Sequence, residues 1–341
     1  MDVLESSWKL LNQIYLMTDV SISICIPTFN RFFHLKETLK NISRLSLKYE
    51  FIKEIVILDN NENSKATSLV APLLKKFEKI RYIKNDKNIG SEENFKKCIL
   101  SAKSEFVWLI ADDDLLFEVA LETISKRINQ KFDCLLVNWS LYDNDINDLL
   151  IDSVLPKNIK FYSDKNFILE NFGSKLSFIS SVIFKKNLFN NHAIAIYDKF
   201  APHQLSFLIF IYYLASSNKI DFIYEKRPLI KQRGENDPFL GKNVTNFYRV
   251  FSEGIASFHQ ELAVMSYQQK SINRSFKESF KRFIFKDLLS RKIENNNFKF
   301  AFQSSLKNYG HFFDLRMLIL LTSIIPSSLL SLLRTIKNLL K

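Results

Sequence analysis

Short apolar runs that end at polar residues alternate with longer segments of helical periodicity through the first 140 residues. The apolar runs are rich in β-branched residues, as buried strands are. We therefore predict strands at 20–27, 51–58, 80–83, 106–110 and 132–139. Helices are predicted after Arg31 and over 69–77, 92–102 and 115–128, with Ser91 as an N-cap. This alternation predicts an α/β fold with a mainly parallel, doubly wound sheet flanked by helices.

The last part of the chain changes character. The stretch from Arg274 to Lys299 is basic, and no charged residue lies between Met317 and Leu333. Pro326 interrupts this apolar run, which favours helices that lie in a membrane interface over one straight spanning helix. A packed helical hairpin or an oligomer contact is the alternative.

Three consecutive carboxylates, Asp112, Asp113 and Asp114, follow the apolar run at 106–110. In open α/β sheets, ligands usually bind at the carboxyl ends of the strands. Crowded carboxylates repel one another, and a hard divalent cation such as Mg²⁺ or Mn²⁺ would relieve that repulsion. The alternative is an acidic helix N-terminus, which the helix dipole would stabilise.

Polar turns follow three of the predicted strands, at 27–31, 59–61 and 112–114. In a parallel sheet these turns meet at one edge. Each turn alone is commonplace, but their coincidence predicts a nucleotide-sized cleft with a metal site.

Composition narrows the class of partner. A net charge of +12 favours an acidic partner, namely a nucleotide, an anionic lipid or a nucleic acid. The basic residues are scattered and the aromatic residues fall on apolar faces, so we expect no nucleic-acid partner. Cys25, Cys98 and Cys134 are odd in number and lack metal-binding spacing, which predicts buried thiols of a reducing cytosol. Residues 1–19 mix acids into their apolar pattern, so we expect no signal peptide.

Four ordered motifs resemble the nucleotide-sugar half of family 2 glycosyltransferases. They are Pro27-Thr-Phe-Asn-Arg31, Ile57-Leu-Asp59, Asn88-Ile-Gly90 with Asn94, and Ile110-Ala-Asp-Asp-Asp114. The resemblance covers about residues 20–140 and is specific because the four motifs occur in order at family-like spacing. The abequosyltransferase-like branch, which acts on bacterial O-antigens, is the most similar. The resemblance implies a GT-A fold, a nucleoside-diphosphate sugar donor, Mg²⁺ or Mn²⁺, and inversion at the anomeric carbon.

The resemblance also implies roles for residues. Asp59 would bind the base, and Asp112 would face the ribose or phosphate. Asp113 or Asp114 would hold the metal. The remaining donor-binding residues would be Pro27, Thr28, Phe29, Asn30, Arg31, Asn88, Gly90 and Asn94. Ala111 departs from the family, which often has an Asp there, so the choice of metal-binding carboxylate stays open.

The second half of the chain is expected to bind the acceptor. A strand-like run at 176–184 resembles the family segment that lines the sugar pocket. Members commonly place a catalytic base, usually in a Glu-Asp pair, just before a helix such as the one predicted at 205–215. That pair is absent, which leaves Asp198 and His203 as candidates. Asp198 could instead be a solvated loop acid or a cap, and His203 a metal ligand, an acceptor contact or a packed cap residue.

Arg233 lies in a polar segment, 231–238, that we predict as a loop after the strand at 220–224. Its guanidinium could clamp a diphosphate, whose oxygens match the geometry of the fork. The alternative is an exposed loop charge.

We therefore expect a metal-dependent inverting hexosyl- or deoxyhexosyltransferase that acts on a hydroxyl of a lipid-linked bacterial surface glycan. It would work in the cytoplasm, peripheral to the inner face of the membrane. The expected parts are a lead-in (1–19), a nucleotide-sugar half (20–140), an acceptor half (141–260) and a helical, membrane-associating extension (261–341). The alternatives are a nucleotidyltransferase, which would normally show a Gly-rich phosphate loop after the first strand, and a basic nucleic-acid-binding protein. The sugar, the base, the acceptor, the linkage and the oligomeric state stay open.

Overall fold

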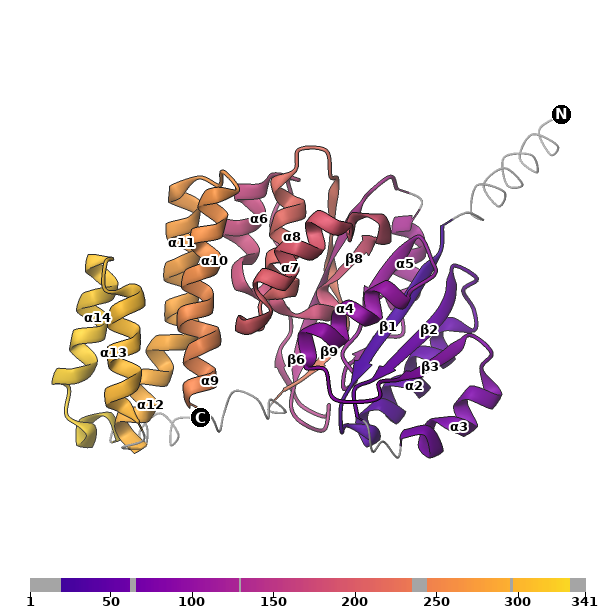
Figure 1. The fold of residues 1–341 in the computed structure, drawn as a ribbon, viewed down its shortest axis with the longest axis horizontal. Coiled ribbons are helices and arrows are strands. Elements are labelled where there is room, and N and C mark those ends of the chain that lie inside the picture. The colour runs from indigo at the N-terminus through magenta and orange to yellow at the C-terminus, as the bar shows by residue number, and fades with distance from the viewer. Residues whose placement is uncertain (1–19, 62–65, 129, 235–243, 295–296, 332–341) are drawn as a thin grey trace. The chain divides into compact units, whose positions relative to one another are not determined.

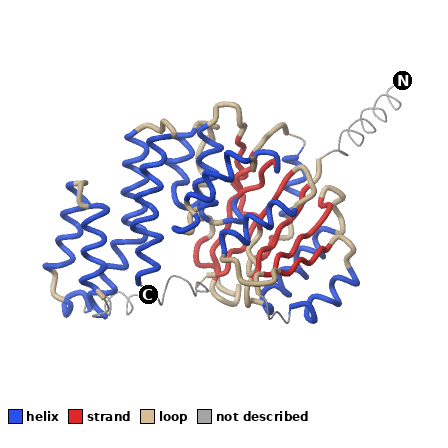
Figure 2. The backbone as a smooth tube through the Cα atoms, viewed as in Figure 1, coloured by secondary structure: helices blue, strands red, loops and turns tan. Residues whose placement is uncertain are grey.

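The computed structural model describes residues 20–61, 66–128, 130–234, 244–294 and 297–331 (Figure 1). The predicted lead-in at 1–19 lies outside these ranges. Contacts divide the chain into two compact units that interleave along the sequence. Unit 1 comprises Met1–Ser163, Phe178–Ile194 and Ser217–Glu235, and unit 2 comprises Asp164–Ser177, Ala195–Ser216 and Asn236–Lys341. Unit 1 contains the sheet, whereas unit 2 is built mainly of helices (Figure 2).

The sheet of unit 1 has a parallel half and a mixed half. The parallel half has the order β3-β2-β1-β4, with β1 Ile22–Thr28, β2 Ile52–Asp59, β3 Ile80–Lys84 and β4 Phe106–Leu109. The order continues β8-β6-β9-β5, with β5 Leu115–Leu116, β6 Cys134–Tyr142, β8 Val182–Lys185 and β9 Phe222–Arg233. β7 Leu149–Ile151 pairs with β6. The predicted parallel arrangement therefore holds for the first four strands, and antiparallel pairs such as β4 with β8 complete the sheet.

Helices cover both faces of this sheet. They are α2 Phe32–Ser46, α3 Ala66–Lys76, α4 Ser91–Ser101 and α5 Ala120–Ile128. Helix α7, Asn191–Lys199, begins in unit 1 and ends in unit 2. The chain runs from β1 outward to β3, with α2 and α3 on one face. It then returns over the other face through α4 to β4, on the far side of β1 (Figure 1). β1 and β4 thus flank a topological switch point, the place where open α/β sheets bind ligands.

Unit 2 is helical in its described parts. Its helices are α6 Lys165–Phe172, α8 Ser206–Ser216, α9 Val244–Tyr248, α10 Ile255–Val264, α11 Gln269–Ser279, α12 Lys286–Glu294, α13 Phe298–Tyr309 and α14 Phe313–Ile324. Wider π-helical turns, Arg249–Gly254 and Phe280–Phe285, connect some of them. A core of Phe276, Phe280, Ile284, Tyr309 and Leu315, among others, joins α11 to α14. None of the helices that the structure describes is long and apolar enough to cross a membrane.

Two predictions of local secondary structure were wrong. Residues 115–116 form strand β5 rather than the start of a helix, because they pair antiparallel with Ile230 and Lys231 of β9, and the helix begins at Ala120. Only the last part of the strand-like run at 176–184 is a strand. The preceding residues form 3₁₀ turns.

The structure also differs at Ser91 and at the segment 231–238. Ser91 is the first helical residue of α4, and Gly90 takes the N-cap position with φ of 83°. The start of the predicted loop at 231–238 is the end of β9. The rest of that loop lies outside the described residues. The three cysteines are buried and free, as predicted.

Candidate active site

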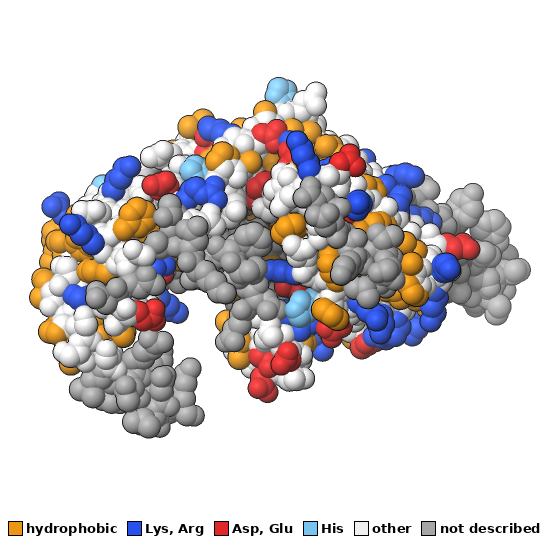
Figure 3. All heavy atoms as spheres, turned by 60° about the horizontal axis from the view of Figure 1, so that its bottom comes forward, with side chains coloured by type: hydrophobic (Ala, Val, Ile, Leu, Met, Phe, Trp, Pro, Cys, Tyr) orange, Lys and Arg blue, Asp and Glu red, His pale blue; other side chains and the backbone are white. Residues whose placement is uncertain are grey.

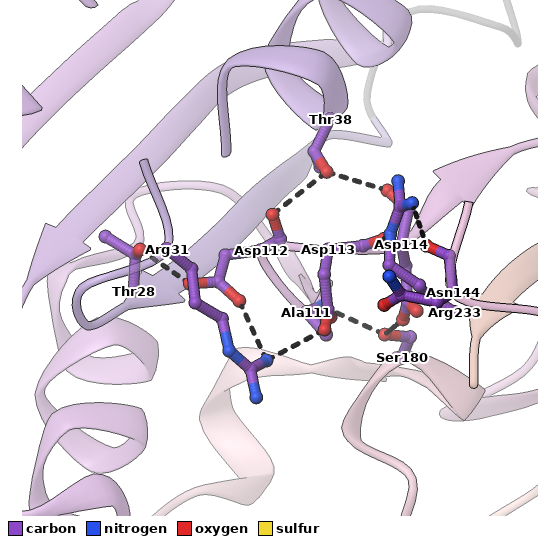
Figure 4. A network of polar contacts seen from close by, with 10 residues as sticks. All are labelled: Thr28, Arg31, Thr38, Ala111, Asp112, Asp113, Asp114, Asn144, Ser180 and Arg233. Atoms are coloured by element: carbon purple, nitrogen blue, oxygen red, sulfur yellow. Dashed lines mark hydrogen bonds and ion pairs between the residues drawn. The ribbon is translucent and has the colours of Figure 1, made fainter. Parts of the chain in front are cut away.

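The aligned strands β1 and β4 bring two polar turns together at the switch point. Cys25 pairs with Leu109, and the amide of Ile110 donates to the carbonyl of Cys25, 2.9 Å away. The polar turn after each strand therefore begins at the same level of the sheet. The Thr28 hydroxyl, at the end of β1, donates to Oδ2 of Asp112 at 2.6 Å (Figure 4).

Arg31 is the main counter-charge of the carboxylates. Its Nη1 lies 2.8 Å from Oδ2 of Asp113 and 3.4 Å from Oδ1 of Asp112. Asn30, with φ of 58°, turns the chain between β1 and α2, and Asn tolerates this left-handed conformation better than most residues. The turn leaves Arg31 at the N-cap of α2, directed at the acids that follow β4 (Figure 4).

Hydrogen bonds from α2 and β9 fix the backbone of the carboxylate loop, residues 112–114. The Thr38 hydroxyl lies 3.1 Å from the carbonyl of Asp112 and 2.9 Å from that of Asp114, and Nε of Arg233 donates to the carbonyl of Asp113 at 3.1 Å. The carboxylates therefore sit on a rigid loop, which is what a preorganised site requires.

Ser180 links this loop to the start of β8. Its hydroxyl donates to Oδ2 of Asp114 at 2.8 Å and accepts from the amide of Ala111 at 3.0 Å. Its carbonyl accepts from Nε1 of Trp108 at 2.9 Å. The predicted sugar-pocket segment at 176–184 thus contacts the acids directly through a 3₁₀ turn.

Arg233 is buried, so the alternative of an exposed loop charge was wrong. Besides Asp113, its guanidinium donates to the carbonyl of Asn144 at 2.5 Å and to the carboxylate of Glu37 at 2.7 Å. All of its nitrogens thus have protein partners, and the side chain braces the carboxylate loop against β9 and α2.

Burial makes Asp112 and Asp114 harder to ionise than ordinary aspartates. Asp112, Asp113 and Asp114 are 4%, 7% and 1% exposed. Burial, with the nearby charge of Asp113, raises the pKa of Asp112 to about 7, and the same two causes raise the pKa of Asp114 well above its usual value. Arg31 alone does not offset three carboxylates, and the charge of Arg233 is already paired with Glu37, so an added cation would be stabilised here.

The carboxylate loop offers ligands of the type that Mg²⁺ and Mn²⁺ prefer, but not a complete set of them. The donors are carboxylate oxygens, which both ions prefer. Within the described ranges, however, no cluster of three or more His, Cys, Asp or Glu residues is arranged as a complete metal cage. The residues fit an ion that takes one or two carboxylates from the protein and fills its shell with water and substrate phosphates.

The second polar turn, after β2, is a network of amide side chains. Asp59 is fully buried, and its two oxygens accept from the hydroxyl of Tyr82 at 2.6 Å and the amide of Asn61 at 3.0 Å. Asn60 donates to Oδ1 of Asn88 at 2.8 Å and to the carbonyl of Gly90 at 3.2 Å.

Asn94 supports the same turn from α4. It donates to the carbonyl of Leu58 at 3.2 Å and accepts from the side chain of Asn85 at 2.9 Å. In this structure Asn94 is buried and anchors the 85–90 loop to β2, while Asn88 and Gly90 are exposed at its tip.

The sequence did not single out His34, Glu37, Thr38 or Ser180. Burial and the Arg233 guanidinium lower the pKa of His34, and the charges of Asp113, Arg31 and Glu37 also act on it. One signal was present: residues 31, 34 and 38 recur at helical spacing, so the first turns of α2 present them on one side. The run at 176–184 was expected to line the sugar pocket, but the approach of Ser180 to Asp114 depends on the sheet topology.

Pro27 and Phe29 belong to the first turn but take no part in the carboxylate network of Figure 4, and Pro27 is buried in β1. The two base candidates lie in unit 2. Asp198 is exposed in the last turn of α7, and His203 is half-buried in a 3₁₀ turn, where its Nδ1 lies 3.3 Å from the carbonyl of Arg249. A Cβ on Gly254 would come within 2.9 Å of the Cβ of His203, so His203 packs closely on that π-helical turn.

Comparisons with known proteins agree with this geometry. Residues 23–189 match the model of glycosyl transferase family 2. Abequosyltransferase RfbV of Salmonella typhimurium is 24% identical over 277 residues, which are 78% of this chain and 80% of that protein. The GalNAc(5)-diNAcBac-PP-undecaprenol beta-1,3-glucosyltransferase of Campylobacter jejuni is 28% identical over 172 residues, 50% of this chain and 53% of that protein.

Two further comparisons also find glycosyltransferases or a similar fold. The uncharacterized glycosyltransferase MJ1057 of Methanocaldococcus jannaschii is 26% identical over 225 residues, 65% of this chain and 73% of that protein. The crystal structure of S. aureus TarS 1-349 superposes with a TM-score of 0.57 at 13% identity, covering 85% of this chain and 89% of that one. The predicted GT-A fold with a helical C-terminal region is confirmed.

Proposed function

Residues 23–189 form a family 2 glycosyltransferase domain, so the chain is a glycosyltransferase, and we propose that it takes its sugar from a nucleoside-diphosphate donor. The carboxylate loop at the switch point, braced by Thr38, Ser180 and Arg233, is the observation that carries the proposal. TarS, which has a similar fold, has been crystallised in complex with UDP and with UDP-GlcNAc, which supports a donor of this class.

The donor would lie across the carboxyl ends of β1, β2 and β4. Asp59 would accept a hydrogen bond from the base, in place of its bond from the Tyr82 hydroxyl or the Asn61 amide. The turn at 27–31 would wrap the nucleoside, and Asp112 would face the ribose or phosphate. Asn88 and Gly90 would close the donor site from their exposed loop, which Asn94 anchors.

Asp113 or Asp114 would hold Mg²⁺ or Mn²⁺ together with the donor phosphates. When bound, such an ion stabilises the negative charge that the leaving diphosphate acquires. Arg31 would supply further positive charge at the same place, since its Nη1 already lies 2.8 Å from Asp113. Arg233 would act by positioning the loop, because its nitrogens are engaged by protein groups.

The acceptor would be a hydroxyl of a bacterial surface glycan, and it would be lipid-linked. The names of the Campylobacter and Salmonella relatives support this class, since one acts on an undecaprenyl-diphosphate glycan and the other transfers abequose. Asp198 or His203 would remove the proton from the acceptor hydroxyl, and single displacement would invert the anomeric carbon. The protein would work at the cytoplasmic face of the membrane.

A donor screen tests this proposal. The full chain is heated with a panel of nucleotide sugars, with and without Mn²⁺, and the midpoint of unfolding is recorded. We expect one donor class to raise the midpoint in the presence of Mn²⁺, because a ligand that binds only the folded state stabilises it. For the Asp113→Asn variant, the midpoint of unfolding should be the same with and without the nucleotide sugar. A chain that no nucleotide sugar stabilises, with or without the ion, would overturn the proposal.

A further inference from the structure

Helix α14 has apolar side chains on both sides, although residues that the structure describes bury only one of them. Leu315 and Ile319 are fully buried in the core that joins it to α11 and α13. On the opposite side, large apolar side chains recur at intervals of four, four and three residues. They are Phe313, 79% exposed, Met317, 44%, Leu321, 44%, and Ile324, 72%. Exposed apolar patches of this kind mark sites where a protein contacts another protein or a membrane.

A basic face of α11 adjoins the start of this apolar face. It comprises Lys270, Arg274 and Lys277 of α11 and Lys281 of the π-helical turn that continues it, which share one side and, with Asn273 and Glu278, line a hollow of about 640 Å³. Lys277 pairs with Asp314, the residue after Phe313, at 2.8 Å. The basic face and the apolar face are therefore neighbours within unit 2, and Figure 3 shows blue and orange side chains intermixed over the C-terminal helices at its left end.

Some of the basic side chains on this face form ion pairs and others do not. Arg274 pairs with Glu170 at 3.0 Å and Lys277 with Asp314. Lys270 and Lys281 have no carboxylate partner among the residues that the structure describes. Two ammonium groups beside an open hollow suit phosphate groups, and the adjacent apolar side chains suit acyl chains.

We propose that the apolar face of α14 and the basic face of α11 form one docking surface for a bilayer that contains anionic lipid. Phe313, Met317, Leu321 and Ile324 enter the boundary between headgroups and acyl chains, while Lys270 and Lys281 contact lipid phosphates. An apolar helix face beside clustered lysines is the usual composition of interfacial anchors. The inference rests on the proposed function only in that a lipid-linked acceptor would lie at the same surface.

Flotation with lipid vesicles tests the proposal. The full-length chain is mixed with vesicles of phosphatidylcholine alone, or of phosphatidylcholine with phosphatidylglycerol, at low salt. Binding should need the anionic lipid and should weaken in high salt, which shortens the range of the charges. Full-length protein that ignores the anionic vesicles would overturn the proposal.

Two double variants separate the two faces. Lys270→Glu with Lys281→Glu should weaken partitioning into anionic vesicles about 30-fold or more, since each lysine near such a surface contributes about fivefold. Phe313→Ser with Ile324→Ser should weaken it about 10-fold or more, by removing apolar area from the interface.

Matched controls lie in unit 1, on exposed side chains of the same kinds. Lys219→Glu with Lys226→Glu makes the same change in net charge, and Leu149→Ser with Leu150→Ser removes apolar side chains that are 50% and 52% exposed. Both controls should float like the unmodified chain. If either control loses as much binding as its counterpart, membrane attachment is unspecific and the proposal is wrong.

Two more measurements identify the competing outcomes. If sedimentation shows a dimer that Phe313→Ser with Ile324→Ser dissociates, the apolar face lies between two copies of the chain, and the proposal is wrong. Stabilisation by the nucleotide sugar is recorded for every variant and should not change. A chain that floats as expected and binds no nucleotide sugar would refute the proposed donor and leave this docking surface intact.

Discussion

The guanidinium of Arg31 and the carboxylate of Asp113 lie 2.8 Å apart across the switch point of the sheet. Arg31 follows β1 and Asp113 follows β4, so this ion pair joins the two turns that the fold brings together. Arg31 is 27% exposed in its side chain and Asp113 10%, so the pair is shielded from solvent but open on one side. That open side is where a donor diphosphate would have to enter.

Replacing Arg31 should weaken donor binding. Arg31→Met removes the charge and should reduce the affinity for the nucleotide sugar about 10-fold or more, the usual value of a charged hydrogen bond. Arg31→Lys keeps the charge without the fork and should lie in between. Calorimetric titration measures both. Unchanged affinity in Arg31→Met would mean that Arg31 only balances the carboxylates.

Turnover should depend on the metal and on the acids that would hold it. Asp113→Asn and Asp114→Asn should each reduce kcat by about 100-fold or more, as the loss of charge stabilisation does in other enzymes, while the fold survives. Glu105→Gln is the control, because Glu105 is an exposed acid at the opposite end of the same strand. Full turnover in excess EDTA would refute the metal's role.

Loss of the base should lower kcat and leave donor affinity intact. Asp198→Asn or His203→Ala should reduce kcat by about 10²–10⁴-fold, the usual contribution of general acid–base catalysis. His192→Ala, an exposed histidine at the start of α7, controls for local damage. If both variants turn over at the normal rate, the base lies elsewhere, and His34 beside the carboxylate loop becomes the next candidate.

Ser180 should matter for the site beyond its contribution to stability. Ser180→Ala removes the hydrogen bonds to Asp114 and to the amide of Ala111, so the carboxylate loop should lose its fixed position. We expect kcat/KM to fall about 10-fold, the cost of leaving such partners unsatisfied. Ser181→Ala is the matched control, since Ser181 is equally buried and donates to the carbonyl of Phe178 instead. Equal losses in the two variants would point to a general packing effect.

His259 should make unit 2 less stable in mild acid. Burial lowers the pKa of His259 from 6.5 to about 3, so below pH 6.5 the unfolded chain binds a proton that the folded chain excludes. The linkage predicts full stability above that pH and a loss of about 2 kcal/mol by pH 5. His259→Gln should remove this part of the slope. Thermal unfolding from pH 7.5 to 5 measures it, and an equal slope in both proteins would contradict the assignment.

Local sequence signals located most of the parallel half of the sheet. The runs that form β1, β2, β3 and β4 are short and apolar and end at polar turns. This pattern can be recognised without knowing which strands pair with each other. The same reasoning placed Arg31 and the three acids at one edge. It failed at residues 115–116, where pairing with β9 overrides the helical periodicity.

Contacts between distant segments could not be predicted. Ser180 meets Asp114 across 66 residues, and Arg233 meets Asp113 across 120. Arg233 looked like part of a polar loop because its neighbours are polar, and its burial depends on the position of β9 in the sheet. The network of Asn60, Asn88 and Asn94 shows the same limit, since the motif contained Asn88 and Asn94 but did not reveal that Asn94 anchors the loop to β2.

The long separation between Asp113 and Arg233 in the sequence also determines the order in which the site can fold during translation. The parallel strands can form once Leu109 has emerged, but the carboxylate loop lacks its brace until Arg233, 120 residues after Asp113, has been made. At usual rates of translation that interval is about 6–24 s. Meanwhile the chain passes between its two units after Ser163, Ser177, Ile194 and Ser216, so neither unit can finish before the other has begun. A nascent chain of this protein therefore exposes the apolar strands of an unfinished sheet edge for many seconds, and exposed apolar surface and unpaired strand edges are what chaperones recognise.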